Sequence, residues 1–200
     1  MNIPVDISNT ILKTERLVLR PFRESDLDDF YEYAKVDGVG QMAGWTPHKD
    51  KQETAKILKS FIAKKRTFAI EKDGKVIGSF GIDNYDEDDL PELKYIRAQE
   101  LGCIVSKDFW GQGIAKETTE AVIDYLFNTL DVEFLVLGHI SWNNQSARVQ
   151  DKMGVQYFKE TEYKTKYGTT EKNIYGALIN PKYKDTIKIE NLLQDKSVSK

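Results

Sequence analysis

The sequence predicts one α/β (α+β) domain, built on a mixed, mostly antiparallel sheet of about seven strands with helices on both faces. Three observations lead to this fold class. The chain has 200 residues, which is enough for one domain of ordinary size. Its composition, 40% hydrophobic and 30% charged, is typical of a globular protein with a charged surface. Segments with strand and helix patterns follow one another along the chain, as a layered α/β architecture requires.

The first half of the chain predicts a strand, two helices and a hairpin. Residues 14–20 alternate in polarity and stop at a proline, which indicates a strand. Ser25 is the expected N-cap of a first helix, because acidic residues and apolar residues at helical spacing follow it. An apolar stripe predicts a second helix over residues 50–65. Residues 67–71 and 75–82 are apolar runs joined by an Asp-Gly turn, which is a strong hairpin signal.

The second half alternates between strands and helices. A strand is expected at residues 95–105, after an acidic loop at residues 83–92, and a helix then runs to about Asn128. Residues 133–140 are almost continuously apolar, which indicates a strand buried on both faces. A short helix over residues 146–153 ends at a glycine, a common helix terminator. Two closing strands are expected at residues 155–162 and 172–180.

Composition and charge exclude several classes of protein. The net charge of −3 argues against binding nucleic acid, because proteins that bind its phosphates carry a basic surplus. No apolar stretch is long enough for a membrane span, and residues 1–10 lack a secretory pattern, so a cytoplasmic protein is expected. The single cysteine, Cys103, excludes an internal disulfide and a zinc site built on several thiolates, and no metal is expected. We expect one domain over residues 1–181 and a charged tail over residues 182–200.

The most informative segment is Trp110-Gly111-Gln112-Gly113-Ile114-Ala115, which opens an amphipathic helix. Glycine lets backbone N–H groups turn outward, and a helix N-terminus favours negative charge, so the segment suits a pyrophosphate. The alternative is a glycine turn that only starts the helix. The segment matches neither the Walker loop, which needs a lysine after its last glycine, nor the dinucleotide fingerprint, which needs a third glycine.

A second polar segment, from Asn143 to Gly154, directly follows the apolar strand. An asparagine at a strand-to-helix junction can pair with the amide groups of an extended ligand, and Ser146 can contact the same ligand. The alternative is plain capping of the helix by Asn144 or Ser146.

These two segments, together with two others in the same order, resemble the Gcn5-related N-acetyltransferase (GNAT) family. The resemblance is closest to the branch that acetylates N-terminal amines of ribosomal proteins, and it covers roughly residues 10–181. The matching segments are Thr14–Pro21 with Ser25-Asp26, Gln99–Gly102, Trp110–Glu117 and Asn143–Gly154. Val155 departs from the phenylalanine usual in the family, and Gly138-His139 stands where a bulkier pair is common.

The resemblance implies a GNAT-like N-acetyltransferase domain with acetyl-CoA as cosubstrate. Family members separate two central strands, and the pantetheine arm inserts between them like an additional strand. Backbone groups near Ile104 and Val105 are therefore expected to pair with that arm, and one amide there would hold the thioester carbonyl. Residues 110–115 are expected to hold the pyrophosphate, and Asn143 is expected to hold the pantetheine arm.

Direct attack of an amine on the thioester leaves two proton transfers to be assigned. Glu100 is the candidate base, acting directly or through a water; the alternative is an ordinary exposed or ion-paired strand residue. Ser146 is the candidate acid toward the leaving thiolate, with helix capping as the alternative. Cys103 is expected to be a small core residue rather than a nucleophile, and His139 a structural histidine.

We therefore expect an enzyme that transfers an acetyl group from acetyl-CoA to a primary amine, either a small molecule or a protein N-terminus. The alternative is a catalytically inactive acyl-CoA-binding module. The acidic loop at residues 83–92 is interpreted either as an attractor of a cationic amine or as solvated surface. Met42 and Trp45 are expected near the acceptor. The sequence leaves a homodimer open.

Overall fold

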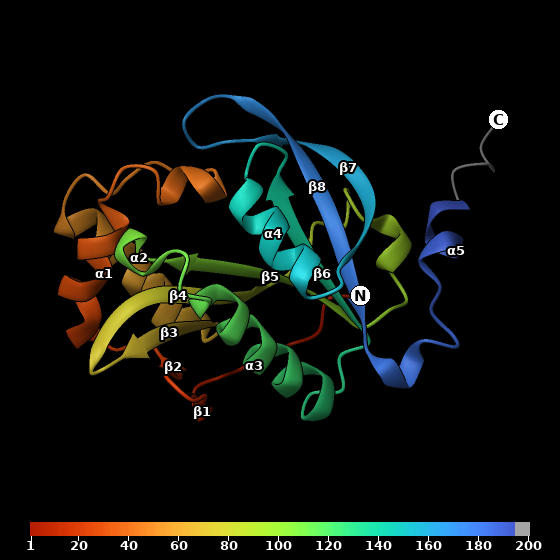
Figure 1. The fold of residues 1–200 in the computed structure, drawn as a ribbon, viewed down its shortest axis with the longest axis horizontal. Helices are drawn as coiled ribbons and strands as arrows, with labels where there is room; N and C mark the ends of the chain where they lie inside the picture. Colours follow the sequence, from red (N-terminus) through yellow and green to blue (C-terminus); the bar gives the residue numbers. More distant parts are fainter. Residues whose placement is uncertain (195–200) are drawn as a thin grey trace.

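Eight strands form one sheet in the order β1-β2-β3-β4-β5-β6-β8-β7 (Figure 1). The structure is a computed structural model, and it describes residues 1–194 of the chain. The strands are β1 (Leu12–Lys13), β2 (Val18–Pro21), β3 (Thr67–Lys72), β4 (Lys75–Asp83), β5 (Ala98–Val105), β6 (Phe134–Ile140), β7 (Gln156–Lys164) and β8 (Thr170–Ile179). The helices are α1 (Leu27–Ala34), α2 (Lys51–Lys64), α3 (Ile114–Asn128), α4 (Asn144–Lys152) and α5 (Ile189–Gln194). The predicted fold class, a mixed and mostly antiparallel sheet with helices, is confirmed.

Within the described residues, β5 and β6 are the only neighbouring strands that pair in parallel, and they pair over only part of their length. Their register runs from Ala98↔Phe134 to Leu101↔Leu137. Beyond this point β5 stays paired with β4, and β6 stays paired with β8. The arrows of β5 and β6 accordingly point apart in Figure 1. This divergence leaves one edge of each strand without a partner strand.

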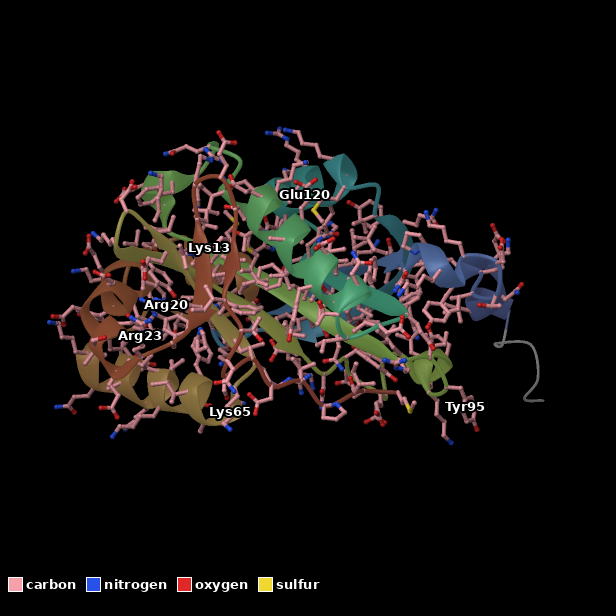
Figure 2. All side chains as sticks on the ribbon, turned by 90° about the horizontal axis from the view of Figure 1, so that it is seen from below. Lys13, Arg20, Arg23, Lys65, Tyr95 and Glu120 are labelled. Carbon is pink, nitrogen blue, oxygen red and sulfur yellow. The ribbon has the colours of Figure 1, made fainter. Side chains whose placement is uncertain are left out.

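Helices cover both faces of the sheet. On one face, α3 packs Val122 and Leu126 onto strand residues such as Leu19 and Phe68 in the largest apolar cluster. Figure 2 looks toward this face, and the exposed Glu120 marks the solvent side of α3. On the other face, α1 and α2 enclose a second cluster that contains Phe30. Burial of apolar surface in these layers supplies the main favourable free energy of folding.

The predicted strand at residues 14–20 is divided in two by a turn. Thr14 and Leu17 close this turn, because the Leu17 N–H donates to Thr14 Oγ1 and the Thr14 N–H donates to the Leu17 carbonyl. The resulting short hairpin of β1 and β2 explains why the sheet has eight strands and not seven. The Asp-Gly turn between β3 and β4 has positive φ at both residues, 50° at Asp73 and 79° at Gly74, as such a hairpin requires.

The prediction that Ser25 caps the first helix is wrong. Ser25 lies inside a single 3₁₀ turn, Glu24–Asp26, that precedes α1. The turn begins early because the Asp26 carboxylate accepts the Arg23 N–H and forms a buried ion pair with Arg20. The Asp26 carboxylate thus bonds the backbone N–H of Arg23, just before the turn, and the serine hydroxyl makes no cap.

Part of the expected charged tail is folded. The chain makes one 3₁₀ turn at Pro181–Tyr183 and then forms α5, at the opposite end of the molecule from α1 and α2 (Figure 1). Ile187, Ile189 and Leu192 pack against an apolar cluster built around Phe134. The rest of the tail, residues 195–200, lies outside the described part of the chain.

Candidate active site

A cavity of about 970 Å³ opens where β5 and β6 diverge. It is lined from both faces of the sheet, by the start of α3 and by α4 on one side and by the acidic loop after β4 on the other. The structure brings most of the predicted site residues to this cavity. Those lining it are Glu100, Ile104, Val105, Trp110, Gly111, Gly113, Ile114, Ala115, Asn143 and Ser146.

The glycine-rich segment before α3 presents backbone N–H groups to the cavity. Gly111 and Gly113 have φ of +76° and +80°, a conformation that side chains with a Cβ rarely adopt. A Cβ on Gly111 would meet nothing within 4 Å, so the loop is open on its outer side. Gly113 is the N-cap of α3, and the first N–H groups of a helix have no partner within the helix. This arrangement fits a pyrophosphate.

An ion pair braces this segment from a distant part of the sequence. The Glu117 carboxylate, in the first turn of α3, accepts hydrogen bonds from Thr14 and from the backbone and guanidinium of Arg16. The Arg16 guanidinium also donates to the Gln112 carbonyl, over 3.0 Å. Gln112 itself does not line the cavity; its carboxamide donates to the Asp108 carbonyl. Gln112 therefore serves as the anchor point of the brace.

The unpaired edge of β5 supplies backbone groups from alternate residues. The Ser106 N–H donates to the Ile77 carbonyl of β4. A Cβ on Gly78 would lie 2.3 Å from the Ile104 carbonyl oxygen, so the backbone groups of Ile104 also point toward β4. Because neighbouring residues of a strand point their N–H and C=O groups to opposite edges, Cys103 and Val105 face the cavity side. The Val105 carbonyl already accepts the indole N–H of Trp110, over 2.8 Å. The free groups at this edge are therefore the Val105 N–H and the backbone of Cys103.

Cys103 was expected only as a core residue, and its backbone position was missed. Burial raises the pKa of its thiol to about 12, so the thiol stays protonated at neutral pH. This supports the expectation that Cys103 is no nucleophile. The direction of its backbone could have been inferred from strand alternation once the neighbouring strand was known.

Asn143 and Ser146 stand at the start of α4, beside the unpaired edge of β6. The Asn143 side chain caps the helix by accepting the Ser146 N–H, and it donates to the Met42 carbonyl over 2.9 Å. Asn143 is therefore the cap, in place of Asn144 or Ser146. Ser146 Oγ accepts a hydrogen bond from Gln150, which in turn contacts His139. Burial lowers the pKa of His139, as expected for a structural histidine.

Glu100 lies on β5 just before the strands diverge, and its Cα pairs with that of Asp83 on β4. Burial, together with the smaller effect of the neighbouring carboxylates of Asp83, Asp86 and Asp89, raises the pKa of Glu100 to about 7. No ion pair or hydrogen bond to its side chain is present within the described residues. A carboxyl group with a pKa near 7 suits a general base at neutral pH.

The acidic loop is divided by the structure into two kinds of residue. Asp86 and Asp89 line the cavity, whereas Glu87 and Asp88 do not. Asp86 accepts the N–H groups of residues 88 and 89, and Asp89 accepts the hydroxyl of Tyr175. The loop therefore presents selected carboxylates to the acceptor side of the cavity.

Of the two residues expected near the acceptor, only Met42 lines the cavity. Trp45 turns away and packs against Gly40, where a Cβ would lie 2.2 Å from its ring. Tyr163 of β7 takes part in this wall and was not predicted, since nothing in its local sequence distinguishes it from other tyrosines. A Cβ on Gly44 would lie 2.3 Å from the Tyr163 ring, so the loop and the strand are closely packed.

Comparisons with known proteins agree with this geometry. A family model described as an acetyltransferase (GNAT) domain matches residues 16–156. The uncharacterized N-acetyltransferase p20 of Bacillus licheniformis is 25% identical over 152 residues, which cover 72% of this chain and 82% of p20. A GCN5-related N-acetyltransferase from Brucella melitensis superimposes with a TM-score of 0.74 at 16% identity, over 96% of this chain and 85% of that one.

Two further solved structures share the fold at low identity. RimL, a ribosomal L7/L12 alpha-N-protein acetyltransferase, has a TM-score of 0.69 at 17% identity, over 84% of this chain and 93% of its own. MccE, a microcin C7 self-immunity acetyltransferase solved with acetyl-CoA and AMP, has a TM-score of 0.70 at 11% identity, over 83% of this chain and 93% of its own.

A mixed sheet split between two central strands, with a glycine-rich helix start at the opening, defines an acetyltransferase cleft. This chain belongs to the GNAT acetyltransferase family, as predicted from its motifs. It is accordingly an acetyl-CoA-dependent N-acetyltransferase. No helix among residues 1–194 has the length and apolar character needed to cross a membrane. The same residues contain no group of three potential metal-ligating side chains.

Proposed function

We propose that this protein transfers the acetyl group of acetyl-CoA directly to a primary amine, with Glu100 as the base and Ser146 as the acid. The observation that carries the proposal is the cavity at the divergence of β5 and β6, which Glu100 lines. A cavity open to both faces lets the cosubstrate enter from one side and the amine from the other.

The cosubstrate end of the cavity offers the backbone N–H groups at the start of α3, and the basic residues Lys116, Arg148 and Lys152 line the same cavity. The N–H groups at the start of α3 hold the pyrophosphate, with Arg16 and Glu117 keeping the loop in place. Backbone groups of Cys103 and Val105 pair with the pantetheine arm, in place of the Ile104 groups suggested by the family resemblance. Asn143 contacts the same arm from a position fixed by its two internal hydrogen bonds.

Two side chains handle the protons. An alkylammonium has a pKa near 10.4, so most of the acceptor must lose a proton before it can attack. Glu100, with a pKa near 7, is deprotonated often enough at neutral pH to take this proton directly or through a water. The new amide bond forms as the carbon–sulfur bond breaks, and the Ser146 hydroxyl stabilises or protonates the departing thiolate.

The acceptor side of the cavity favours a cation. Asp83, Asp86, Asp89 and Glu100 line it, and the described residues provide no ion pair for any of the four carboxylates. The tyrosines at positions 163 and 175 add aromatic surface, which also favours cations. Both a small amine and a protein N-terminus carry such a charge, and the likeness to RimL, an alpha-N-protein acetyltransferase, makes the second a candidate to test.

A panel of acceptors tests the proposal. Purified protein is mixed with acetyl-CoA and with a polyamine, a monoamine, a lysine-free peptide with a free N-terminus, or the same peptide with a blocked N-terminus. We expect release of the CoA thiol with at least one free amine and none with the blocked peptide. If no amine raises thiol release above the rate of acetyl-CoA hydrolysis, transfer to a primary amine is contradicted. A Glu100→Gln protein serves as the control for contaminating activity.

A further inference from the structure

Gln150 is a buried polar residue to which the mechanism above assigns no role. It lies on α4, four residues after Ser146, so that both side chains project from the same face of the helix. Only 4% of its surface is exposed, although it lines the cavity wall. Buried amides are stable only when they are hydrogen-bonded, and all three contacts of this amide are to groups at the divergence of the strands.

These contacts determine which way the amide faces. Gln150 Nε2 donates to Ser146 Oγ over 3.2 Å and to the Gly138 carbonyl over 3.5 Å. Gln150 Oε1 lies 3.1 Å from His139 Nδ1. The reverse orientation would place two carbonyl oxygens, those of Gln150 and Gly138, against each other. The backbone of β6 therefore selects the orientation in which Gln150 donates to Ser146.

The same orientation defines the proton on His139. A carbonyl oxygen only accepts, so His139 Nδ1 must carry a hydrogen to bond with Gln150 Oε1. Burial lowers the pKa of His139 below its ordinary value of 6.5, so the ring is neutral at neutral pH with its one proton on Nδ1. His139 thus acts as the donor that holds Gln150 in place.

We propose that Gln150 is a positioning residue that makes the Ser146 hydroxyl a hydrogen-bond donor toward the cavity. Because Ser146 Oγ accepts from Gln150 and has no other side-chain bond within the described residues, its own O–H is available to the cavity. There it meets the sulfur that leaves the acetyl group. The proposal rests on the role of Ser146 in the proposed function.

The decisive variant is Gln150→Glu, which is nearly isosteric and reverses one hydrogen bond. A carboxylate accepts from His139 as the carboxamide does, but it also accepts from Ser146 and so draws the hydroxyl proton away from the cavity. With the best acceptor from the amine panel, we expect kcat to fall roughly tenfold or more, with KM for acetyl-CoA nearly unchanged. Gln156→Glu, which adds the same charge at an exposed position outside the cavity, is the matched control.

A double-mutant comparison separates positioning from a general structural role. If Gln150 acts through the hydroxyl, Gln150→Glu combined with Ser146→Ala is no slower than Ser146→Ala alone. Losses that multiply, or full kcat in Gln150→Glu, overturn the assignment of Gln150 and leave that of Ser146 intact. Full kcat in Ser146→Ala overturns both assignments while acetyl transfer to the amine stands.

Two further measurements keep the test independent of folding and of activity. Gln150→Met removes the donor to Ser146 without introducing a charge, and it should also lower kcat. It takes the place of Gln150→Glu in the test if that variant does not fold. Nitrogen NMR of the wild-type protein near pH 7.5 should show a neutral His139 protonated on Nδ1. A ring protonated on Nε2 alone would overturn the orientation of Gln150 on which the proposal depends.

Discussion

Replacement of Glu100 by glutamine tests the link between burial and catalysis most directly. Burial and three neighbouring carboxylates raise the pKa of Glu100 from 4.5 to about 7. At 1.36 kcal/mol per pKa unit, ionising this side chain in the folded protein costs on the order of 3 kcal/mol. The raised pKa suits catalysis, because a base that titrates near 7 can take up a proton at the working pH.

The kinetic consequence is an acidic limb in the pH profile near pH 7, which the variant should lack. For the wild type, kcat/KM should rise with pH on an acidic limb with an apparent pKa near 7. Glu100→Gln should lower kcat/KM by roughly 10²-fold at pH 7, with partial recovery at high pH, where more of the amine is already deprotonated. Rates are measured by thiol release from pH 5.5 to 10. Full activity of the variant across this range would show that another group or water takes the proton.

The same substitution should increase the stability of the folded protein, although it lowers the activity. The folded-state pKa lies above the unfolded value, so the destabilisation is absent below about pH 4.5, appears as the pH rises, and is complete above about pH 7. Glu100→Gln should therefore raise the thermal midpoint by a few degrees at pH 8 and change it little at pH 4.5. Glu24→Gln, at an exposed position, is the control and should show no such pH-dependent gain. An equal effect at both pH values would refute the burial argument.

Three other predictions concern binding at the two ends of the cavity. Gly113→Asp should weaken acetyl-CoA binding by roughly 2–4 kcal/mol in calorimetry. The loss should exceed that of Gly113→Ala, which introduces the same backbone strain at φ +80° without a charge. Equal affinities of the two variants would contradict the pyrophosphate assignment. Glu117→Gln should raise KM for acetyl-CoA severalfold with kcat little changed, because the brace on Gln112 is loosened; an unchanged KM would mean that the loop holds its shape alone. Asp86→Asn and Asp89→Asn should lower kcat/KM for a cationic amine at low salt and less at high salt, whereas Asp88→Asn should not; equal effects of all three would leave the loop as solvated surface.

Much of the fold could be predicted from local patterns. Helical spacing located α2 and α3 to within a residue or two, and the Asp-Gly pair located the β3–β4 hairpin. The errors occurred where side-chain hydrogen bonds and ion pairs within a few residues changed the local outcome. Ser25 lost its capping role because Arg20, Arg23 and the Asp26 carboxylate meet at that turn. The strand at residues 14–20 was interrupted by a turn that the alternation of polarity does not reveal.

For the site, the sequence by itself determined which residue types were present and where they stood along the chain. The glycines at 111 and 113 before a helix, and the polar residues Asn143 and Ser146 after a buried strand, were visible as motifs. In the folded chain these four residues line the same cavity.

Only the tertiary structure decided how these groups act. It directed the backbone N–H and C=O groups of Cys103 and Val105, and not those of Ile104, toward the unpaired edge of β5. The reason is that pairing with β4 uses the backbone groups of alternate residues of β5. It buried Glu100 and placed the carboxylates of residues 83, 86 and 89 near it, and both effects raise its pKa. It set the amide of Gln150 between Ser146 and the backbone of β6. Electrostatic and hydrogen-bond interactions depend on distance in space, and residues that are far apart along a chain acquire such distances only when the sheet and helices pack.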